Sequence, residues 1–208
     1  MRFKEYLLES RGIHFFDIDE TLFKTKAKVY VLNKDTGEII KKLSNQEFNT
    51  YQLNQNEIYD FREFKDSKLF TKTSEPIGTM IAKLKAIFKN ASKNGSEIYL
   101  LTARQDFDNK EKLLQYFRGL GIDVGHKNEG KIHIIRAGNT AVSKGLKSAE
   151  AKKEVINNFV KTNKYSRIRL YDDDKTNLDK FLELKNDYPN YKFEAYLVKD
   201  AKAKTYKG

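Results

Sequence analysis

The sequence predicts an α/β fold organised around a parallel sheet. Short apolar runs, which are typical of buried strands, alternate along the chain with longer stretches in which apolar residues recur at helical spacing. Strands are expected near residues 13–17, 97–102, 131–136, 167–172 and 193–198. Helices are expected near residues 77–93, 109–120, 149–163 and 177–187. Because strands that alternate with helices form parallel sheets covered on both faces, we expect a Rossmann-like three-layer sandwich with five parallel strands.

The composition is that of a polar chain with a basic balance. The 208 residues are enough for one domain of good size, and 39% of them are hydrophobic. No apolar run approaches the roughly 18 residues of a membrane span. The start of the chain lacks the apolar core of a signal peptide, and cysteine is absent, so we expect a cytoplasmic protein. The net charge of +11 favours anionic partners, of which nucleic acid or a nucleotide is the first candidate.

The first expected strand leads into two carboxylates. After an expected amphipathic helix over residues 1–12, the apolar run Ile13–Phe16 is followed by Asp17 and Asp19. Ligands bind at the carboxyl ends of strands in open parallel sheets. Two carboxylates there require a cation, and Mg²⁺ prefers oxygen ligands, so Asp17 would be free to attack an electrophile that the metal polarises. The alternative is a capped turn, since acids are common at helix starts and in loops.

Residues 24–75 interrupt the alternation of strands and helices. Residues 29–40 predict a β-hairpin around a polar turn that contains Gly37. Residues 44–75 are rich in polar and aromatic residues and receive no firm assignment. A connection of this length is usually functional or has structure of its own. Its aromatic residues are expected to form an internal core, and the alternative is that they stack on nucleic-acid bases.

Polar residues also follow the second and fourth strands. Thr102 and Arg104 come at the end of the strand near residues 97–102, where a hydroxyl and a guanidinium can bind phosphoryl oxygens. Three adjacent acids, Asp172, Asp173 and Asp174, follow the strand near residues 167–172. Adjacent carboxylates repel one another and require a cation, which a capped turn alone does not explain.

The segments between and beyond these motifs are expected to be simpler. Gly138 to Ser148 is expected to be a loop, and the phosphate-binding sequence G-x-x-x-x-G-K-[ST] is absent from the chain. Lys152 and Lys153 fall in the first turn of the helix near 149–163. The lysine-rich residues 199–208 are expected to form a frayed basic tail.

The motifs together resemble those of the haloacid dehalogenase superfamily. The string D-x-D-x-T-L-F, which begins at Asp17, resembles its first motif, and Asp172 to Asp174 resemble its fourth. The form Thr-x-Arg at Thr102 and Arg104 resembles the polynucleotide 3′-phosphatase and nucleotidase branch. The chain is also similar to small stand-alone members, such as those carried by phages. The resemblance covers residues 13–23 and 76–198 as a catalytic core.

The resemblance implies a role for each motif. Asp17 would be the nucleophile that becomes an aspartyl-phosphate, and Asp19 the general acid/base, whose carbonyl also binds Mg²⁺. Asp173, followed by Asp172, would complete the metal site, and Asp174 would be a helix cap. Thr102 would contact the phosphoryl group, and residues 24–75 would form a small cap over the site.

The resemblance also calls for a lysine about twenty residues before the fourth motif, to neutralise the nucleophile and the phosphoryl group. Lys153 lies 19 residues before Asp172 and Lys152 lies 20. Spacing does not choose between them, and Lys144 is a weaker third candidate.

The sequence therefore predicts a Mg²⁺-dependent phosphatase. The basic charge and Arg104 favour a nucleic-acid 3′-phosphate or a nucleotide as the substrate. Two alternatives stay open: a phosphatase of the same superfamily that acts on a sugar or other metabolite phosphate, and a non-catalytic nucleic-acid-binding module on this fold. The sequence gives no oligomeric state.

Overall fold

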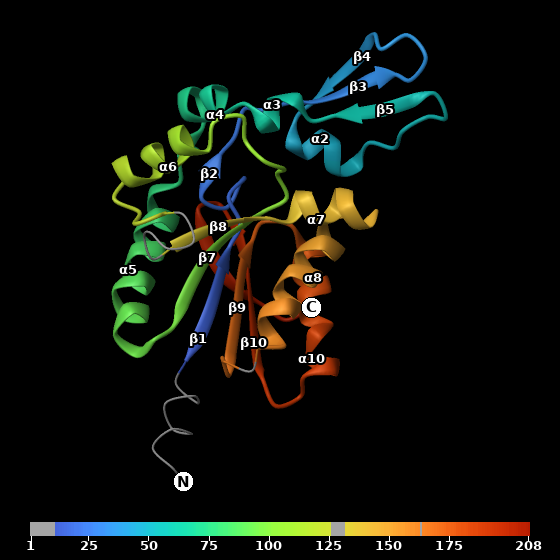
Figure 1. Cartoon of the computed structure of the whole chain (residues 1–208). Coiled ribbons are helices and arrows are strands. Elements are labelled where there is room, and N and C mark those ends of the chain that lie inside the picture. The colour runs from blue at the N-terminus through green and yellow to red at the C-terminus, as the bar shows by residue number, and fades with distance from the viewer. Residues whose placement is uncertain (1–10, 126–131, 163) are drawn as a thin grey trace.

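The computed structural model describes residues 11–125, 132–162 and 164–208. Its centre is a six-stranded sheet in the order β11-β10-β9-β1-β7-β8 (Figure 1). The strands are β1 (Gly12–Phe16), β7 (Glu97–Thr102), β8 (Ile132–Arg136), β9 (Arg167–Asp172), β10 (Lys192–Lys199) and β11 (Lys202–Tyr206). All neighbours pair in parallel except β10 and β11. The predicted α/β fold with a mostly parallel sheet is confirmed, and the expected helix at residues 1–12 lies largely outside the described residues.

The sixth strand corrects one prediction. Residues 199–208 were expected to fray, but β11 pairs antiparallel with β10 from Lys199 opposite Lys202 to Ala195 opposite Tyr206. The reversal is made by Asp200 and Ala201, which both adopt left-handed φ angles of 51° and 60°. The lysines that suggested a solvated tail are instead typical of an edge strand, where they discourage pairing with other chains.

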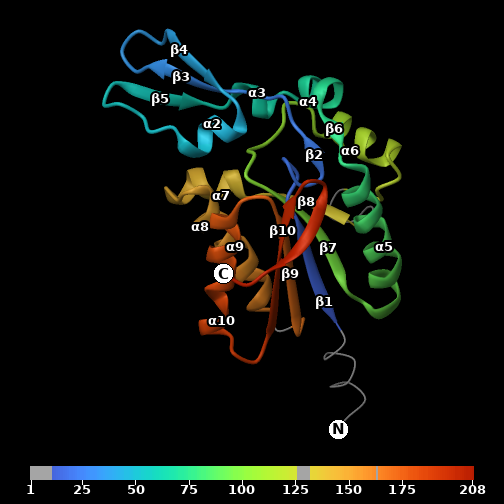
Figure 2. The same ribbon diagram turned by 180° about the vertical axis from the view of Figure 1, so that it is seen from behind.

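Helices cover both faces of the sheet (Figures 1 and 2). Helices α5 (Gly78–Asn94) and α6 (Lys110–Gly119) pack on one face, and their apolar residues form one core with Phe16 and Leu100 of the sheet. The other face carries α8 (Ser148–Val160), α9 (Lys175–Leu182) and α10 (Leu184–Asp187), which pack around Phe15, Ile168 and Leu170. Within the described residues, no helix is long and apolar enough to cross a membrane.

Helix α7 (Ala137–Lys144) replaces most of the expected loop at Gly138 to Ser148. It ends at Gly145, whose φ of 64° is the left-handed conformation that commonly closes helices. At Gly138 a side chain would collide with the backbone of Ala103 and Arg104, so only glycine allows α7 to begin this close to the end of β7. The small and polar residues of this segment look like a loop in sequence because the contact that orders them is distant in the chain.

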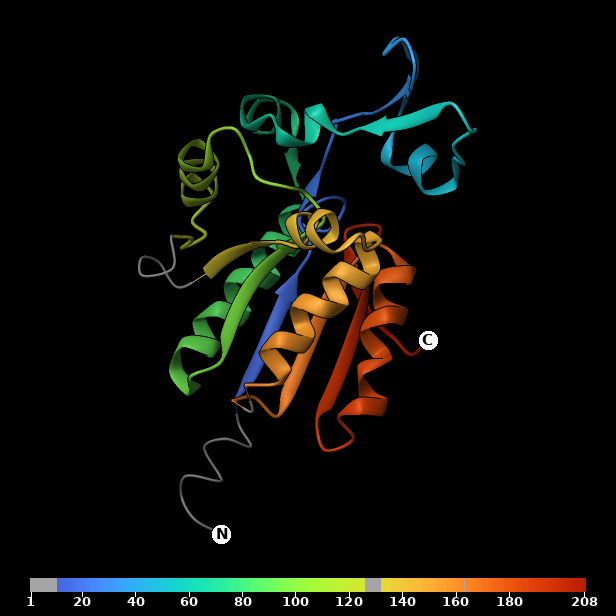
Figure 3. The ribbon, with the colours of Figure 1, turned by 45° about the vertical axis from the view of Figure 1, so that its right-hand side comes forward.

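Residues 24–75 form a separate small layer above the carboxyl ends of the strands (Figure 3). The chain enters and leaves through two short strands that pair antiparallel, β2 (Phe23–Lys24) and β6 (Glu75–Pro76). The predicted hairpin is confirmed as β3 (Val29–Asn33) and β4 (Ile39–Leu43), and β5 (Glu57–Asp60) joins β3 on its other side. The remaining elements are α2 (Asn45–Thr50), α3 (Arg62–Lys65) and α4 (Ser67–Thr73). We call residues 24–75 the insertion.

Most aromatic residues of the insertion form its own core, as expected. Phe48, Tyr51, Tyr59 and Phe64 pack around the buried Val29, Val31 and Leu43. Phe70 is different, because it is buried in the main core against Phe23 and Phe117. This side chain fixes one end of the insertion to the body of the protein.

Candidate active site

Asp17 lies where β1 ends, beside the end of β9. Its backbone N–H donates to the Tyr171 carbonyl at 2.9 Å, which carries the β1–β9 ladder one residue past Phe16. Asp17 therefore stands next to Asp172. Both side chains are buried, Asp17 with 4% and Asp172 with 0% of its surface exposed.

A tight turn brings Asp19 to the same place. The N–H groups of Leu22 and Phe23 both donate to the Ile18 carbonyl at 3.0 Å, and Glu20 adopts a left-handed φ of 55°. Ile18 is fully buried between the two acids. The turn therefore leaves the side chains of Asp17 and Asp19 to line one cavity.

Asp172 and Asp173 complete an acidic cluster. Carboxylate oxygens of Asp17, Asp172 and Asp173 all lie within 4.8 Å of one another. Asp172 is held in place by the Asn177 side-chain amide, which donates to it at 2.8 Å. Asp174 accepts from the Thr176 N–H at 2.8 Å and caps α9, as expected.

Lys152 is the lysine that reaches this cluster. Its Nζ donates to Asp17 Oδ1 and to Asp172 Oδ2, both at 2.7 Å, and its side chain is 2% exposed. Lys153 points elsewhere and pairs with Glu183 at 2.8 Å. Lys144 pairs with Glu154 at 2.7 Å. The structure thus brings one of the three candidate lysines to the carboxylates.

The charges of the cluster are incompletely balanced. Burial raises the pKa of the Asp17 carboxyl well above its usual range, against the opposing charge of Lys152. Burial and the neighbouring charge of Asp172 raise the pKa of Asp173 to about 7. Burial alone would lower the pKa of Lys152, but the carboxylates of Asp17 and Asp172 outweigh it and raise this pKa.

The donor set fits a hard divalent cation. One ammonium against three carboxylates leaves two negative charges when all the groups are ionised. Carboxylate oxygens are the ligands that Mg²⁺ prefers. Among the described residues, no other group of three acidic, histidine or cysteine side chains is close enough to hold a metal.

Arg104 lies on Asp19. Its Nε donates to Asp19 Oδ2 at 2.8 Å and its Nη2 to Asp19 Oδ1 at 2.6 Å, so the pair is bidentate. The same guanidinium donates to the Phe64 carbonyl at 2.9 Å and to Thr25 Oγ1 at 3.1 Å. Both of these partners belong to the insertion. Arg104 therefore lines the cavity, but these donors bind Asp19 and the insertion rather than a phosphoryl group.

Thr102 is fully buried, and its hydroxyl accepts from the Arg104 N–H at 3.1 Å. It is not among the residues that line the cavity, although Ala103, Arg104 and Gln105 are. In this structure Thr102 shapes the chain that carries Arg104, and its expected contact with a phosphoryl oxygen stays a prediction.

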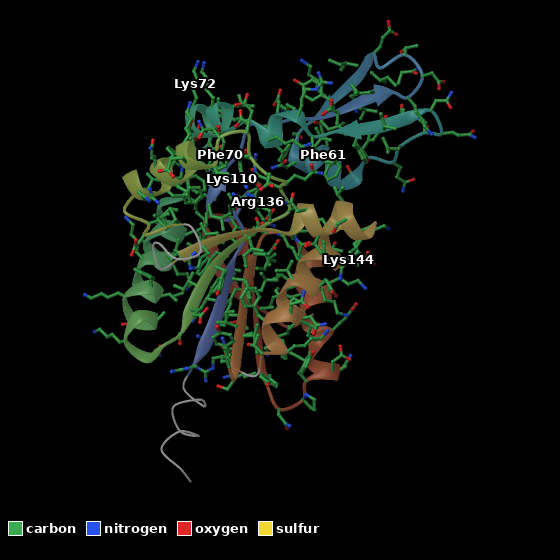
Figure 4. The ribbon with its side chains drawn as sticks, viewed as in Figure 1. Phe61, Phe70, Lys72, Lys110, Arg136 and Lys144 are labelled. Atoms are coloured by element: carbon green, nitrogen blue, oxygen red, sulfur yellow. The ribbon has the colours of Figure 1, made fainter. Side chains whose placement is uncertain are left out.

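The carboxylates line a cavity of about 490 Å³ between the body of the protein and the insertion. Its other wall residues come from the segment after β7, from α7 and the residues that follow it, from the starts of α8 and α9, and from the insertion. Figure 4 shows Phe61 on the side of the insertion that is turned toward α7, and Lys144 near the end of that helix. A cavity of this volume is in the range of drug-sized ligands, roughly 300–1,000 Å³.

Sequence reasoning missed three residues that build the site. Thr25 and Phe64 hold Arg104, and Gly138 lets α7 approach it. Thr25 and Phe64 carry no sequence signal, because Thr25 acts through a common hydroxyl and Phe64 through its backbone. Gly138 does carry a signal. It is a glycine at the start of a helix whose φ is not left-handed, and such a glycine indicates close packing against another stretch of backbone.

Comparison with known proteins returned no match to this chain among protein-family models, curated proteins or solved structures.

Proposed function

We propose that this protein is a Mg²⁺-dependent phosphatase of the haloacid dehalogenase type, which hydrolyses a phosphomonoester through an aspartyl-phosphate on Asp17. The observation that carries the proposal is the position of Asp17. It is a buried carboxylate at the end of a parallel strand, it is held at 2.7 Å by Lys152, and it lines a ligand-sized cavity. An isolated structural acid needs neither the lysine nor the two further carboxylates.

Asp17, Asp172 and Asp173 would hold Mg²⁺ through their carboxylates, and Asp19 through its backbone carbonyl. The metal, when bound, would supply positive charge to offset the phosphoryl oxygens. Lys152 favours the ionised form of Asp17 against the burial that raises its pKa, and it adds a second positive charge beside the phosphoryl group. Asn177 fixes the orientation of Asp172.

The reaction has two steps. A carboxylate oxygen of Asp17 attacks phosphorus, the bond from phosphorus to the ester oxygen breaks, and Asp19, protonated and released from one of its two Arg104 hydrogen bonds, gives its proton to that oxygen. Asp19, now a carboxylate, takes a proton from water as the water oxygen attacks phosphorus. The bond from Asp17 to phosphorus then breaks, and inorganic phosphate leaves. Arg104 orients the Asp19 carboxylate for this second step.

The net charge of +11 supports a nucleotide or a nucleic-acid 3′-phosphate as the substrate. A phosphatase for metabolite phosphates would use the same residues, so the wall of the cavity must decide between them. A non-catalytic nucleic-acid-binding module would need neither Asp17 nor Asp19 in the geometry described above.

The test is phosphate release from a nucleoside monophosphate, a 3′-phosphorylated oligonucleotide and p-nitrophenyl phosphate, with Mg²⁺ and with EDTA. We expect release that requires Mg²⁺ and is lost in Asp17→Asn. Asp187→Asn is a matched control, because it changes the same group on α10, outside the cavity. Folded protein that releases phosphate from none of these substrates, or an Asp17→Asn variant with full activity, would contradict the proposal.

A further inference from the structure

The cavity has an apolar half in addition to its carboxylate end. On the insertion side it is lined by Val29, Phe48, Phe61 and Phe64. Facing them from α7 and the residues that follow it are Ala141, Val142 and Leu146. Val142 is 66% exposed and Phe61 is 36% exposed, although both are large apolar side chains. Apolar surface left open inside a concave site is a feature of ligand-binding pockets.

The aromatic rings of this half support one another. Phe61 packs edge-to-face on Phe48, with ring centroids 5.5 Å apart, and on Phe64, at 6.3 Å. Phe48 in turn packs edge-to-face on Tyr59 at 4.9 Å. Neighbours on two sides restrict the Phe61 ring, so its exposed surface is preorganised for a flat partner.

The charges of the cavity limit the number of phosphates that it can take. Among the described residues, three cations line it, and Arg104 and Lys152 already pair with Asp19, Asp17 and Asp172. Only Lys65 is left for a second anion, while five acids line the same wall: Asp17, Asp19, Glu20, Asp173 and Asp174. The basic balance of the whole chain is therefore not reproduced inside the cavity.

We infer that the substrate carries a single phosphoryl group and an uncharged aromatic ring, and that this ring lies between Phe61 and Val142. The inference rests on the proposed function and assigns the second half of the same cavity. A polyol phosphate fits poorly, because the apolar half offers few partners to its hydroxyl groups. A nucleic-acid strand drawn into the cavity would bring flanking phosphates to a wall whose charged residues are mainly acidic.

The kinetic test compares a nucleoside monophosphate, glycerol 3-phosphate and a 3′-phosphorylated oligonucleotide on wild type, Phe61→Ala and Val142→Lys. Loss of one ring-stacking contact is expected to raise KM for the nucleoside monophosphate about tenfold, with kcat little changed. KM for glycerol 3-phosphate is expected to stay the same. Ile39→Ala is the matched control, since Ile39 is 49% exposed on the same insertion but does not line the cavity.

A binding test separates this inference from the chemistry. The chain has 12 tyrosines but no tryptophan, so Phe61→Trp introduces a single tryptophan whose fluorescence can be excited selectively. We expect saturable quenching by the nucleoside, which is the dephosphorylated product and does not turn over, and no quenching by glycerol. Quenching by the nucleoside, together with no phosphate release by wild type, would contradict the proposed phosphatase activity but support the aromatic binding site.

Two results would overturn the inference while the phosphatase stands. The first is a KM for the nucleoside monophosphate that Phe61→Ala and Val142→Lys leave unchanged. The second is an oligonucleotide KM at least tenfold below that of the nucleoside monophosphate, because flanking phosphates would then contribute to binding.

Discussion

Lys152 and Lys153 are neighbours in the sequence, but we expect their substitution to have very different effects on stability and activity. Lys152→Met removes the only ammonium that contacts Asp17 and Asp172 among the described residues, and leaves two buried carboxylates facing each other. Removing one partner of a buried ion pair costs about 3–5 kcal/mol of unfolding free energy. Lys153→Met removes a partly exposed pair with Glu183, which keeps Lys180 at 2.8 Å. A surface pair of this kind contributes little to stability.

The assay is urea unfolding of both variants without Mg²⁺, together with phosphate release in saturating Mg²⁺. For Lys152→Met we expect the unfolding free energy to fall by several kcal/mol. Its kcat should fall by a factor of about 10²–10³, the range for removal of one donor that stabilises charge in the transition state. Lys153→Met should keep both its stability and its activity. If Lys152→Met does not fold, Asp17→Asn/Lys152→Met should be the more stable of the two, because it leaves one buried carboxylate, Asp172, without the ammonium instead of two.

Two results would refute this reasoning. Equal stability losses in the two single variants would mean that Lys152 is not the buried partner. A fully active Lys152→Met variant would mean that Lys152 takes no part in the reaction.

Three further predictions concern the metal, a buried histidine and a packed glycine. Mg²⁺ at 100 times its Kd should raise the unfolding free energy by about 2.7 kcal/mol, measured by thermal denaturation, and Asp173→Asn should reduce this gain. Burial, followed by the charge of Arg169, lowers the pKa of His14 to about 4, so between pH 6.5 and pH 4 the unfolded chain binds the proton that folded His14 rejects. The His14 contribution to stability should therefore fall by about 3 kcal/mol as the pH drops through that window, so wild type should lose about that much more unfolding free energy than His14→Gln; equal slopes for the two proteins would contradict this. Gly138→Ala should cost about 1–3 kcal/mol of stability because its Cβ meets the backbone of Ala103 and Arg104, whereas Gly119→Ala, with open space around it, should cost nothing.

The sheet and the ends of its strands were predictable because they depend on local patterns. The apolar run before Asp17 and the run before Asp172 each indicate a buried strand, and a parallel sheet brings the ends of such strands together. The metal-site candidates follow from this alone. The order of the strands and the antiparallel β11 are set by contacts that no local pattern carries.

The choice between Lys152 and Lys153 was contained in the sequence, although spacing from Asp172 did not provide it. Lys152 precedes Val155, Ile156 and Val160 by three, four and eight residues, which places it on the apolar face of α8. Lys153 is rotated away from that face and is partly exposed. Helical periodicity, applied to the charged residues as well as the apolar ones, selects the lysine that reaches the carboxylates.

The Arg104–Asp19 pair and the way the insertion packs on the rest of the protein were beyond sequence reasoning. The two residues of the pair are 85 positions apart, and Arg104 is held through Phe64 by a backbone carbonyl. Free arginine donors suggest an anion clamp in sequence, but the fold gives these donors to a carboxylate. The aromatic residues of the insertion likewise divide between its own core, the main core and the wall of the cavity, a division that only tertiary packing makes.

The central claim is that Asp17 becomes covalently phosphorylated and that Asp19 activates the water that releases it. The most direct measurement is the first turnover of Asp19→Asn with p-nitrophenyl phosphate and Mg²⁺, since this leaving group departs without a proton donor. We expect a burst of about one p-nitrophenolate per enzyme followed by a stall, with one phosphoryl group on the peptide that contains Asp17 by mass spectrometry. A burst that persists in Asp17→Asn/Asp19→Asn, or steady turnover of Asp19→Asn at the wild-type rate, would contradict the claim.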